Sequence, residues 1–533
     1  MPQVTPDFDV IIVGSGPAGV SAAFPLVKSG LRVLMMDGGQ EAAIAHPTQP
    51  FLTSRAKDID QWRWMVGEDF YALQMREAVS PKLRVPTHDY VFDNFLVANK
   101  IAAQNFVAVG SLATGGLSNA WGCGVARLSE AELSEFPCHA SDMDSPYETV
   151  ARRMGISGCN NDDMKDYFGL DAWSQQPIKM DTLHEYLYAR YTNRRAKFVP
   201  LGFRLGRSRV AALSEDHAGR LACNNSGNCL WGCHRRSLYS AADDLPSLRQ
   251  YKNFHEMNGF IVDDLIRNGD ILSVQGQINR TKERRTFTAN KVMLAAGTLA
   301  TTRLALHALR HEKPVQLLSC PTAAFLFWLP HLLGEPRVSA FGLGQLSFSL
   351  TLRNDITAFG STFGTTGITI SEFVRHLPLQ RRYGIDLLRG LLSSCLVGNV
   401  FLPGNLSTSE AKLRKDGSLF VTGGYNESVP DIMAEAAKKL RKSYWQLGAL
   451  ILPGSFTIGH PGGDIHYAGT LPMRGNPSVC ETNAIGELQG LMGVHVVDGA
   501  CLPSLSEKSH TLTLMANADR ISRAVAEQMN VTY

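Results

Sequence analysis

The sequence predicts a mixed α/β fold with two domains, one built on a parallel sheet and one on an antiparallel sheet backed by helices. The chain opens with a buried strand, a glycine-rich turn, a helix and a second buried strand that ends in an acid. A strand ending in an acid returns at residues 494–498, followed by a helical pattern. Strand patterns and one long helix fill the middle of the chain. Since 533 residues exceed one ordinary core, we expect the two ends to build one domain and the middle to build another.

The opening carries the spacing of a Rossmann-like dinucleotide-binding unit. Gly14, Gly16 and Gly19 form a GxGxxG turn, and Asp37 closes the second strand. The first glycine allows the tight turn, the second lets the backbone approach a pyrophosphate, and the third lets the helix pack on the sheet. Unpaired N–H groups at the helix start would hold the pyrophosphate, and the acid would bind a ribose. Pro25 lies inside this helix and is expected to kink or shorten it.

Composition excludes several classes of protein. Charged residues make up 19% and hydrophobic residues 44% of the chain, with a net charge of +3, which is typical of a globular protein. Basic residues are scattered rather than gathered in a stripe, which argues against nucleic-acid binding. Ten cysteines in a chain of this length do not indicate a disulfide scaffold.

Membrane and targeting signals are also weak. The first apolar run is the opening strand rather than a signal peptide, so we expect a cytoplasmic protein, with export bound to a partner subunit left open. No run of 18 apolar residues is present, so we expect no transmembrane segment. The densest apolar piece, residues 323–329, is either a buried segment or a docking surface for a membrane or a partner subunit.

Periodicity and turn residues predict the remaining elements. We expect a hairpin at 267–270, a strand ending at 297 followed by a helix, a strand at 340–352, a hairpin at 415–417, a helix at 431–447 opened by Pro430, and a last helix at 511–526. The predicted dinucleotide-binding domain comprises residues 1–165, 215–310 and 486–533. The predicted second domain comprises residues 166–214 and 311–485.

Several motifs together resemble one family. Two histidine motifs lie near the end of the chain, at residues 466–473 (HYAGTLPM) and at 509–513 (SHTLT), the second preceded by 497–500 (VDGA). A glycine-rich stretch at 110–122 is too apolar for a linker, which indicates a backbone pressed against something flat and buried. With the opening βαβ unit, these motifs resemble the glucose–methanol–choline oxidoreductases, flavoproteins that oxidise alcohols with FAD.

The resemblance implies roles for individual residues. His466 would be the base that takes the alcohol proton, which suits imidazole because its pKa lies near working pH, and His510 would orient the substrate oxygen. No histidine stands in the segment 118–121, so the FAD is expected to be bound noncovalently. Besides Gly14, Gly16, Gly19 and Asp37, the implied cofactor contacts are Gly115, Gly116, Asn119, Trp121, Val262, Ala296, Gly297, Asp498, Gly499 and Thr511.

Three cysteines gather in one short loop. Cys223, Cys229 and Cys233 are spaced by six and four positions, and His234 follows directly. Three thiolates on one loop can converge on a metal. The spacing resembles that of multi-subunit sugar dehydrogenases of the same family, which implies a 3Fe-4S cluster. A zinc site, a disulfide and free thiols are the alternatives, although the adjacent Cys233 and His234 make poor tetrahedral partners.

The resemblance implies an FAD-dependent alcohol oxidoreductase. We expect a dehydrogenase rather than an oxidase, acting on a small-molecule alcohol that is a sugar or sugar-like, with an electron-acceptor protein or subunit as a partner. The alternatives are an oxidase of a bulky apolar alcohol, a non-oxidising flavin lyase of the same fold, and a binding protein with a degenerate cofactor site. Retention of His466 and His510 argues for oxidation, and the intact glycine turn argues against a degenerate site.

Overall fold

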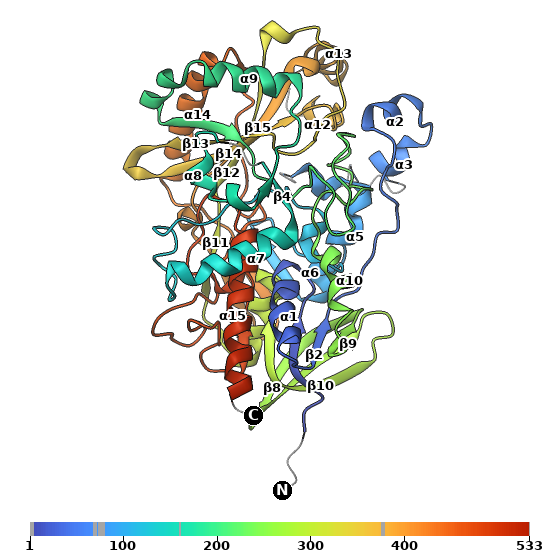
Figure 1. The fold of residues 1–533 in the computed structure, drawn as a ribbon, viewed down its shortest axis with the longest axis vertical. Coiled ribbons are helices and arrows are strands. Elements are labelled where there is room, and N and C mark those ends of the chain that lie inside the picture. The colour runs from blue at the N-terminus through green and yellow to red at the C-terminus, as the bar shows by residue number, and fades with distance from the viewer. Residues whose placement is uncertain (1–4, 68–71, 73–79, 159–160, 375–378, 532–533) are drawn as a thin grey trace.

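The computed structural model describes residues 5–67, 72, 80–158, 161–374 and 379–531. Two large sheets occupy opposite ends of an elongated molecule, and both chain termini lie at the end that carries the first sheet (Figure 1). Strands and helices from distant parts of the chain meet in each half, so neither half is a continuous stretch of sequence.

The first sheet has seven strands in the order β7-β2-β1-β10-β9-β8, with β21 also paired to β10. The second half of β10 runs parallel to β1 and β21, while its first half pairs antiparallel with β9. Parallel strands that are covered on both faces need continuous runs of apolar residues, and β1 contains such a run. The strands are β1 (Phe8–Val13), β2 (Val33–Met36), β7 (Phe254–Met257), β8 (Phe260–Asn268), β9 (Ile271–Ile278), β10 (Arg284–Leu294) and β21 (Val494–Val496).

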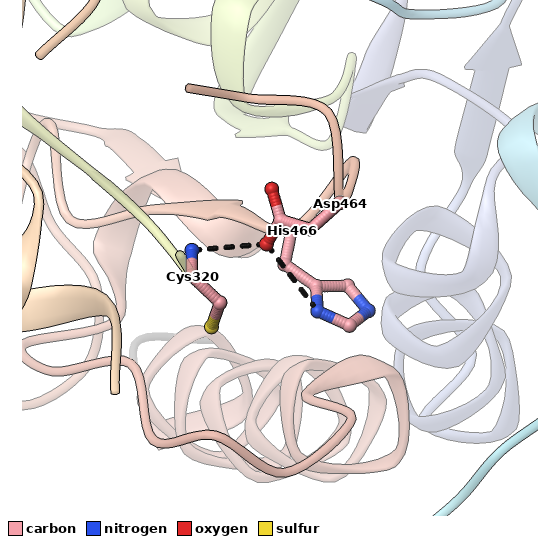
Figure 2. Close-up of side chains that lie close together, drawn as sticks. All are labelled: Cys320, Asp464 and His466. Carbon is pink, nitrogen blue, oxygen red and sulfur yellow. Dashed lines mark hydrogen bonds and ion pairs between the residues drawn. The ribbon is translucent and has the colours of Figure 1, made fainter. Parts of the chain in front are cut away.

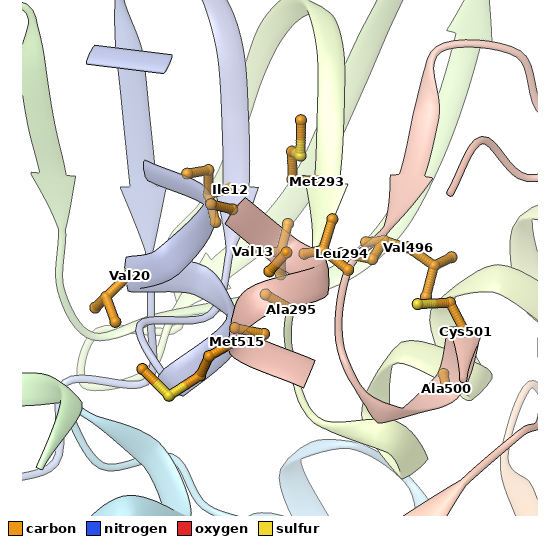
Figure 3. Packing of buried hydrophobic residues seen from close by; sticks show 14 of the residues in the cluster. Ile12, Val13, Val20, Met293, Leu294, Ala295, Val496, Ala500, Cys501 and Met515 are labelled. Atoms are coloured by element: carbon orange, nitrogen blue, oxygen red, sulfur yellow. The ribbon is translucent and has the colours of Figure 1, made fainter. Parts of the chain in front are cut away.

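The two ends of the chain share the core of this sheet. Helix α15 (Thr511–Val531) packs beside α1 (Pro17–Lys28), as Figure 1 shows. Val20 of α1 and Met515 of α15 lie against the strand ends that carry Val13 and Leu294 (Figure 3). All four side chains are buried within one hydrophobic cluster. The first and last segments of the chain are therefore parts of one folding unit.

The second large sheet is antiparallel and is backed by helices. Its strand order is β18-β12-β15-β14-β13-β6, with β19 also paired to β12. Helix α14 (Val429–Gln446) contributes Met433, Leu440 and Tyr444 to the cluster behind the sheet, and α9 (Thr182–Thr192) adds Leu187. The strands are β6 (Phe203–Arg207), β12 (Thr322–Trp328), β13 (Leu346–Thr351), β14 (Thr357–Gly364), β15 (Cys395–Phe401), β18 (Leu450–Ile451) and β19 (Thr457–Ile458).

A five-stranded sheet brings in further segments, in the order β20-β11-β16-β17-β3. Its strands are β3 (Ile101–Gln104), β11 (Val315–Ser319), β16 (Ser409–Leu413), β17 (Leu419–Thr422) and β20 (Tyr467–Ala468), and a two-stranded sheet pairs β4 (Ile156–Ser157) with β5 (Ser174–Gln175). The other helices are α2 (Phe51–Lys57), α3 (Gln61–Met65), α5 (Asp89–Phe92), α6 (Phe95–Ala98), α7 (Asp144–Met154), α8 (Lys165–Phe168), α10 (Leu245–Leu248), α11 (Thr298–Leu309), α12 (Ser371–Val374) and α13 (Arg381–Leu391).

Most of the predicted local elements are present. The hairpin between β8 and β9 turns at Gly269 and Asp270, and that between β16 and β17 turns near Gly417. Helix α14 begins at Val429, two residues before the predicted start. The apolar residues 323–329 belong to β12, which pairs with β15 and with β18 and β19 and buries Phe325 and Phe327, so the buried alternative is correct.

Two local predictions differ from the structure. Helix α1 continues past Pro25 to Lys28, because this proline lies in the last turn and removes only one backbone donor. The strand predicted at 340–352 is confined to β13. A Cβ on Gly342 would lie 3.2 Å from Cys229, and one on Gly344 would lie 3.2 Å from Ser361, so this stretch is a close-packed loop. The residue boundaries of the two domains stay a prediction.

In the described residues, no helix is both long enough and apolar enough to cross a membrane.

Tyr444 provides a test of the packing behind the second sheet. Its ring lies 4.5 Å from that of Phe327, and its hydroxyl is buried without a hydrogen-bond partner among the described residues. A buried unsatisfied hydroxyl costs free energy. We therefore expect Tyr444→Phe to raise the free energy of unfolding by about 1 kcal/mol, measured by thermal or urea unfolding. A loss of stability would show that the hydroxyl has a partner. Tyr444→Ala, which removes the ring, is expected to cost about 3 to 5 kcal/mol.

Candidate active site

One cavity joins the glycine-rich turn of the first sheet to the inner face of the second. Its volume is about 550 Å³, which is within the ordinary range for small-molecule and cofactor sites. Its lining comes from many separated stretches of the sequence. The predicted site residues that line it are Gly14, Gly16, Asp37, Gly116, Trp121, Val262, Ala296, Gly297, His466, Asp498, Gly499, His510 and Thr511.

The three glycines of the opening turn occupy three different environments. Gly14 has a φ of +111°, and a Cβ there would lie 2.2 Å from the carbonyl oxygen of Ala295. A Cβ on Gly19 would lie 1.9 Å from the carbonyl oxygen of Gly14. A Cβ on Gly16 would meet nothing within 4 Å, so this position faces open space in the cavity. The first and third glycines are therefore required by packing, and the second leaves room for a ligand.

The N-terminus of α1 is suited to binding an anion. Its first turn begins Pro17-Ala18-Gly19, and the N-cap residue Gly16 supplies no side chain to bond the free N–H groups. Those N–H groups and the helix dipole favour a negative charge. The cavity reaches this turn, so a pyrophosphate can accept bonds from the backbone there.

Asp37 is held by a network that the sequence motif did not include. The hydroxyl of Ser15 donates to its carboxylate and accepts from the backbone N–H of Gly115 at 3.0 Å. The backbone N–H of Gly39 donates to the other carboxylate oxygen at 2.9 Å. Burial raises the pKa of Asp37, although the hydrogen bonds from Ser15 and Thr114 oppose that shift. Ser15 therefore links Asp37 by hydrogen bonds to Gly115, in the second glycine-rich segment of the chain (residues 110–122).

The second glycine segment is supported from behind by Asn119. Its Nδ2 donates to the carbonyls of Thr114 and Gly116, both at 2.9 Å, and its Oδ1 accepts from Ser240 at 2.8 Å. Asn119, Gly115 and Gly19 lie outside the lining of the cavity, and their predicted contacts with the cofactor stay predictions. All three hydrogen bonds of the Asn119 amide go to the protein.

Trp121 forms part of the cavity wall. Its indole N–H donates to the carbonyl of Tyr239 at 2.8 Å, and its own carbonyl accepts from Lys82. Lys82 also lines the cavity, and burial lowers its pKa. This lysine was not among the predicted site residues, because a lone lysine in the sequence carries no positional signal.

Asp498 joins the last strand of the first sheet to the start of α11. One carboxylate oxygen accepts from the N–H of Gly297 at 2.9 Å and from the hydroxyl of Thr301 at 2.5 Å. The other accepts from the N–H of Ala500 at 3.0 Å. Burial raises its pKa to about 6 even with these bonds. The carboxylate holds two backbone segments at the cavity wall, and Gly499 and Thr511 line the cavity beside it.

His466 and His510 lie close together in the wall of the same cavity. Their ring centroids lie 5.0 Å apart in an edge-to-face arrangement, and the ring of Phe401 lies 5.4 Å from that of His466. Nδ1 of each histidine is buried without a partner among the described residues. Burial lowers the pKa of His466 to about 4 and that of His510 to about 3. Both imidazoles are therefore neutral at neutral pH.

A buried carboxyl lies behind His466 (Figure 2). Oδ2 of Asp464 accepts from the backbone N–H of Cys320 at 2.9 Å and lies 3.6 Å from Nδ1 of His466. Asp464 was not predicted, although the signal was present: it precedes the histidine by two residues. Burial raises its pKa to about 8. The thiol of Cys320 donates to the carbonyl of Ser506 at 3.3 Å.

The cysteine loop differs from the metal-site prediction. Potential ligand atoms of Cys320, Asp464 and His466 lie within 4.8 Å of one another, but Cys223, Cys229 and Cys233 form no such group in the described residues. Each of the nine cysteines that the structure describes is an unpaired thiol; Cys159 lies outside the described residues.

The loop thiols are engaged elsewhere. Sγ of Cys229 accepts from the N–H of Gly342 at 3.3 Å, and Cys223 bonds with Asn225. Burial raises the pKa of both thiols. The arrangement of the three thiols does not support the predicted 3Fe-4S cluster, while the zinc site and the free thiols stay alternatives. A motif on one loop does not fix the directions of its side chains.

Comparisons with known proteins agree with this geometry. The model of an FAD binding domain matches residues 9–76. The crystal structure of pyridoxine 4-oxidase from Mesorbium loti superposes with a TM-score of 0.58 and 15% identity, over 97% of this chain and 99% of that chain. No curated protein sequence matches the chain. The predicted α/β fold with an FAD-binding domain is confirmed, and the FAD-binding model supports FAD as the dinucleotide.

The side chains present fit an FAD molecule. Gly16 faces open space beside the free N–H groups of α1, where the pyrophosphate would lie, and Asp37 lies at the adjacent wall for the ribose. Val262 also lines the cavity, where the predicted adenine contact would place it. The flavin would then extend towards Trp121 and the two histidines, which line the same cavity.

We expect Gly16→Val to abolish FAD retention without unfolding the protein. The side chain would occupy open cavity space rather than collide with protein atoms, and it would block the approach of the pyrophosphate to the backbone. Flavin absorbance per chain after purification measures the effect.

Gly475→Val is the matched control. A Cβ at Gly475 also meets nothing within 4 Å, but this residue does not line the cavity. Full flavin content is expected in this variant. Full flavin content in Gly16→Val as well would show that the cofactor does not approach the turn.

Proposed function

We propose that this chain is an FAD-dependent oxidoreductase of the glucose–methanol–choline type that oxidises a CH–OH group. The observation that carries the proposal is that one cavity is lined both by the glycine turn and by the adjacent His466 and His510. Oxidation of an alcohol requires a hydride acceptor and a proton acceptor close together, and this cavity can hold both. The fold match and the FAD-binding model support the same activity.

In this proposal His466 is the general base. Its buried imidazole is neutral at neutral pH, which is the form that accepts a proton. Nδ1 is enclosed by protein beside Asp464, so Nε2 is the nitrogen that can reach a substrate in the cavity. His510, edge-to-face with it, would hydrogen-bond the substrate oxygen and orient the hydroxyl. FAD, when bound, supplies the hydride acceptor.

Hydroxyl groups on the second sheet favour a polyhydroxylated substrate. Ser208, Ser347 and Ser361 line the cavity and form a hydroxyl row, with Oγ–Oγ distances of 2.7 and 2.9 Å. Asn399, which accepts from the backbone N–H of Ser361 at 2.8 Å, lines the same wall. Such a row can exchange hydrogen bonds with successive hydroxyls of a sugar or sugar-like alcohol. We therefore propose that substrate class.

Phenylalanines on the same wall favour the second candidate, a bulky apolar alcohol. Phe359 and Phe401 line the cavity, and Phe401 packs on the ring of His466. The two classes are separated by anaerobic reduction of the bound flavin with matched panels of sugars, polyols and aromatic alcohols. Bleaching by polyhydroxylated compounds alone supports the proposal, and bleaching by aromatic alcohols alone overturns it. Reduction by neither panel, in a protein that retains FAD, favours the non-oxidising flavin lyase.

The electron acceptor is proposed to be something other than oxygen, which makes the enzyme a dehydrogenase. The resemblance of the sequence to sugar-oxidising dehydrogenases supports this, and an acceptor protein or subunit stays a prediction. Slow reoxidation of the reduced flavin by air, together with fast reoxidation by a quinone or a dye, is the expected behaviour. Fast reoxidation by air would make the protein an oxidase.

We expect His466→Ala to lower kcat by ~10² to 10⁴ while FAD stays bound, as for loss of a general base. Turnover of the alcohol identified by flavin bleaching measures the effect. His255, which is exposed on β7, provides the control: His255→Ala is expected to keep wild-type turnover. Wild-type turnover in His466→Ala would refute the role of this histidine.

The pH dependence follows from the burial of the base. A general base must be unprotonated, and His466 loses that form only as the pH falls through its pKa of about 4. The acid limb of kcat/KM is therefore expected well below the ordinary imidazole pKa of about 6.5. Circular dichroism over the same pH range checks that the fold is intact. An acid limb near 6.5 would show that the base is solvated or is another group.

A further inference from the structure

Asp464 lies between the backbone of Cys320 and the ring of His466 (Figure 2). Its side chain is 0% exposed, and its Oδ2 lies 3.6 Å from Nδ1 of the histidine. Neither Oδ1 of Asp464 nor Nδ1 of His466 has a hydrogen-bond partner among the described residues. A buried polar group without a partner is costly, so each of these two atoms requires an explanation.

The backbone between the two residues is strained. Ile465 has a φ of +61°, in the left-handed region that a β-branched residue rarely adopts. Such a conformation persists only where the surrounding structure holds it, and it is found most often at functional sites. Ile465 is the one residue between Asp464 and His466, and the side chains of these two residues lie close together. The strained backbone thus occurs where the carboxyl approaches the imidazole.

We propose that Asp464 is a positioning residue, which accepts a hydrogen bond from Nδ1–H of His466 and so keeps Nε2 unprotonated and directed at the cavity. This inference rests on the proposed function of His466 as the base. A distance of 3.6 Å is longer than a hydrogen bond, and catalytic hydrogen bonds of ligand-free enzymes are often long and shorten in the complex. A small rotation of the ring closes the gap.

The ionisation of the carboxyl is compatible with this bond. Burial raises the pKa of Asp464 to about 8, so it is largely protonated at neutral pH. Oδ2 accepts from the N–H of Cys320, and with the acid proton on Oδ1 it keeps a lone pair for a second hydrogen bond. The other titratable groups facing this carboxyl are Cys320, Tyr425 and Tyr467, and burial raises the pKa of each well above neutrality.

A metal ion is a poorer explanation of the same three residues. The thiol of Cys320 donates to the carbonyl of Ser506 at 3.3 Å, so it is already engaged with the protein. Nδ1 of His466 has no hydrogen-bond partner among the described residues, and Oδ2 of Asp464, 3.6 Å away, can accept from it without a coordination shell.

The tautomer of His466 tests the proposal without an activity assay. We would record long-range ¹H–¹⁵N spectra of the FAD-loaded protein with ¹⁵N-labelled histidine rings, using His466→Gln for assignment. The expected signal at neutral pH is a protonated Nδ1 and an unprotonated Nε2. Asp464→Asn should keep this tautomer, because its amide oxygen can take the place of Oδ2. Asp464→Leu, of similar shape but without an acceptor, should lose it.

Two results would overturn the proposal. One is a wild-type His466 that carries its proton on Nε2. The other is an unchanged tautomer in Asp464→Leu. Because the wild-type spectrum is decisive by itself, the test holds even if Asp464→Leu fails to fold after losing the acceptor for the N–H of Cys320.

Kinetics separate this inference from the proposed function. Asp464→Leu is expected to lower kcat by ~10 to 100-fold, in the range of other residues that orient a functional histidine, with KM little changed. Added to His466→Ala, the same change should cause no further loss, because residues that act as a unit are not additive. A further loss would indicate a purely structural residue. An active His466→Ala would instead refute the base, whatever the tautomer.

Discussion

The close approach of the turn after β1 to the end of β10 is the constraint on which the rest of the structure depends. At Gly14 and Gly19 a single added carbon would lie 2.2 Å and 1.9 Å from backbone oxygens. This contact sets the start of α1 at the edge of the sheet and directs its free N–H groups into the cavity. It also brings the ends of β10 and β21 together, so that Asp498 can hold the start of α11. The cofactor site follows from backbone packing.

Burial then determines the protonation states of the groups around His466 and His510. Removal from water disfavours the charged form of every group, so the pKa of Asp464 and Asp498 rises and that of His466 and His510 falls. At neutral pH both imidazoles are therefore neutral. A neutral imidazole enclosed on one side, with an acceptor behind it, is prepared to take a proton from an alcohol. The same desolvation strengthens the hydrogen bonds that hold it in place.

Sequence reasoning was reliable where the signal is local. The βαβ unit, the hairpins near Gly269 and Gly417, and helix α14 depend on periodicity and turn residues a few positions apart. It carried less information where the outcome depends on distant contacts. Asn119 directs its amide to Thr114 and to Ser240, the second of which is far away in the sequence. Among the described residues, the three thiols of the cysteine loop do not come together as a group that could hold a metal. Ser15 and Asp464 gain their importance from partners that are distant in sequence, such as Gly115 and Cys320.

The most direct test of the account is an anaerobic titration of the purified protein with polyhydroxylated alcohols, followed by the absorbance of its flavin. The account requires one FAD per chain, bound noncovalently, that is reduced by a sugar or polyol in the absence of any other reductant. The denatured protein should release that FAD into solution. A protein that purifies without flavin and cannot be loaded with it would contradict the account, because the cavity would then serve another ligand.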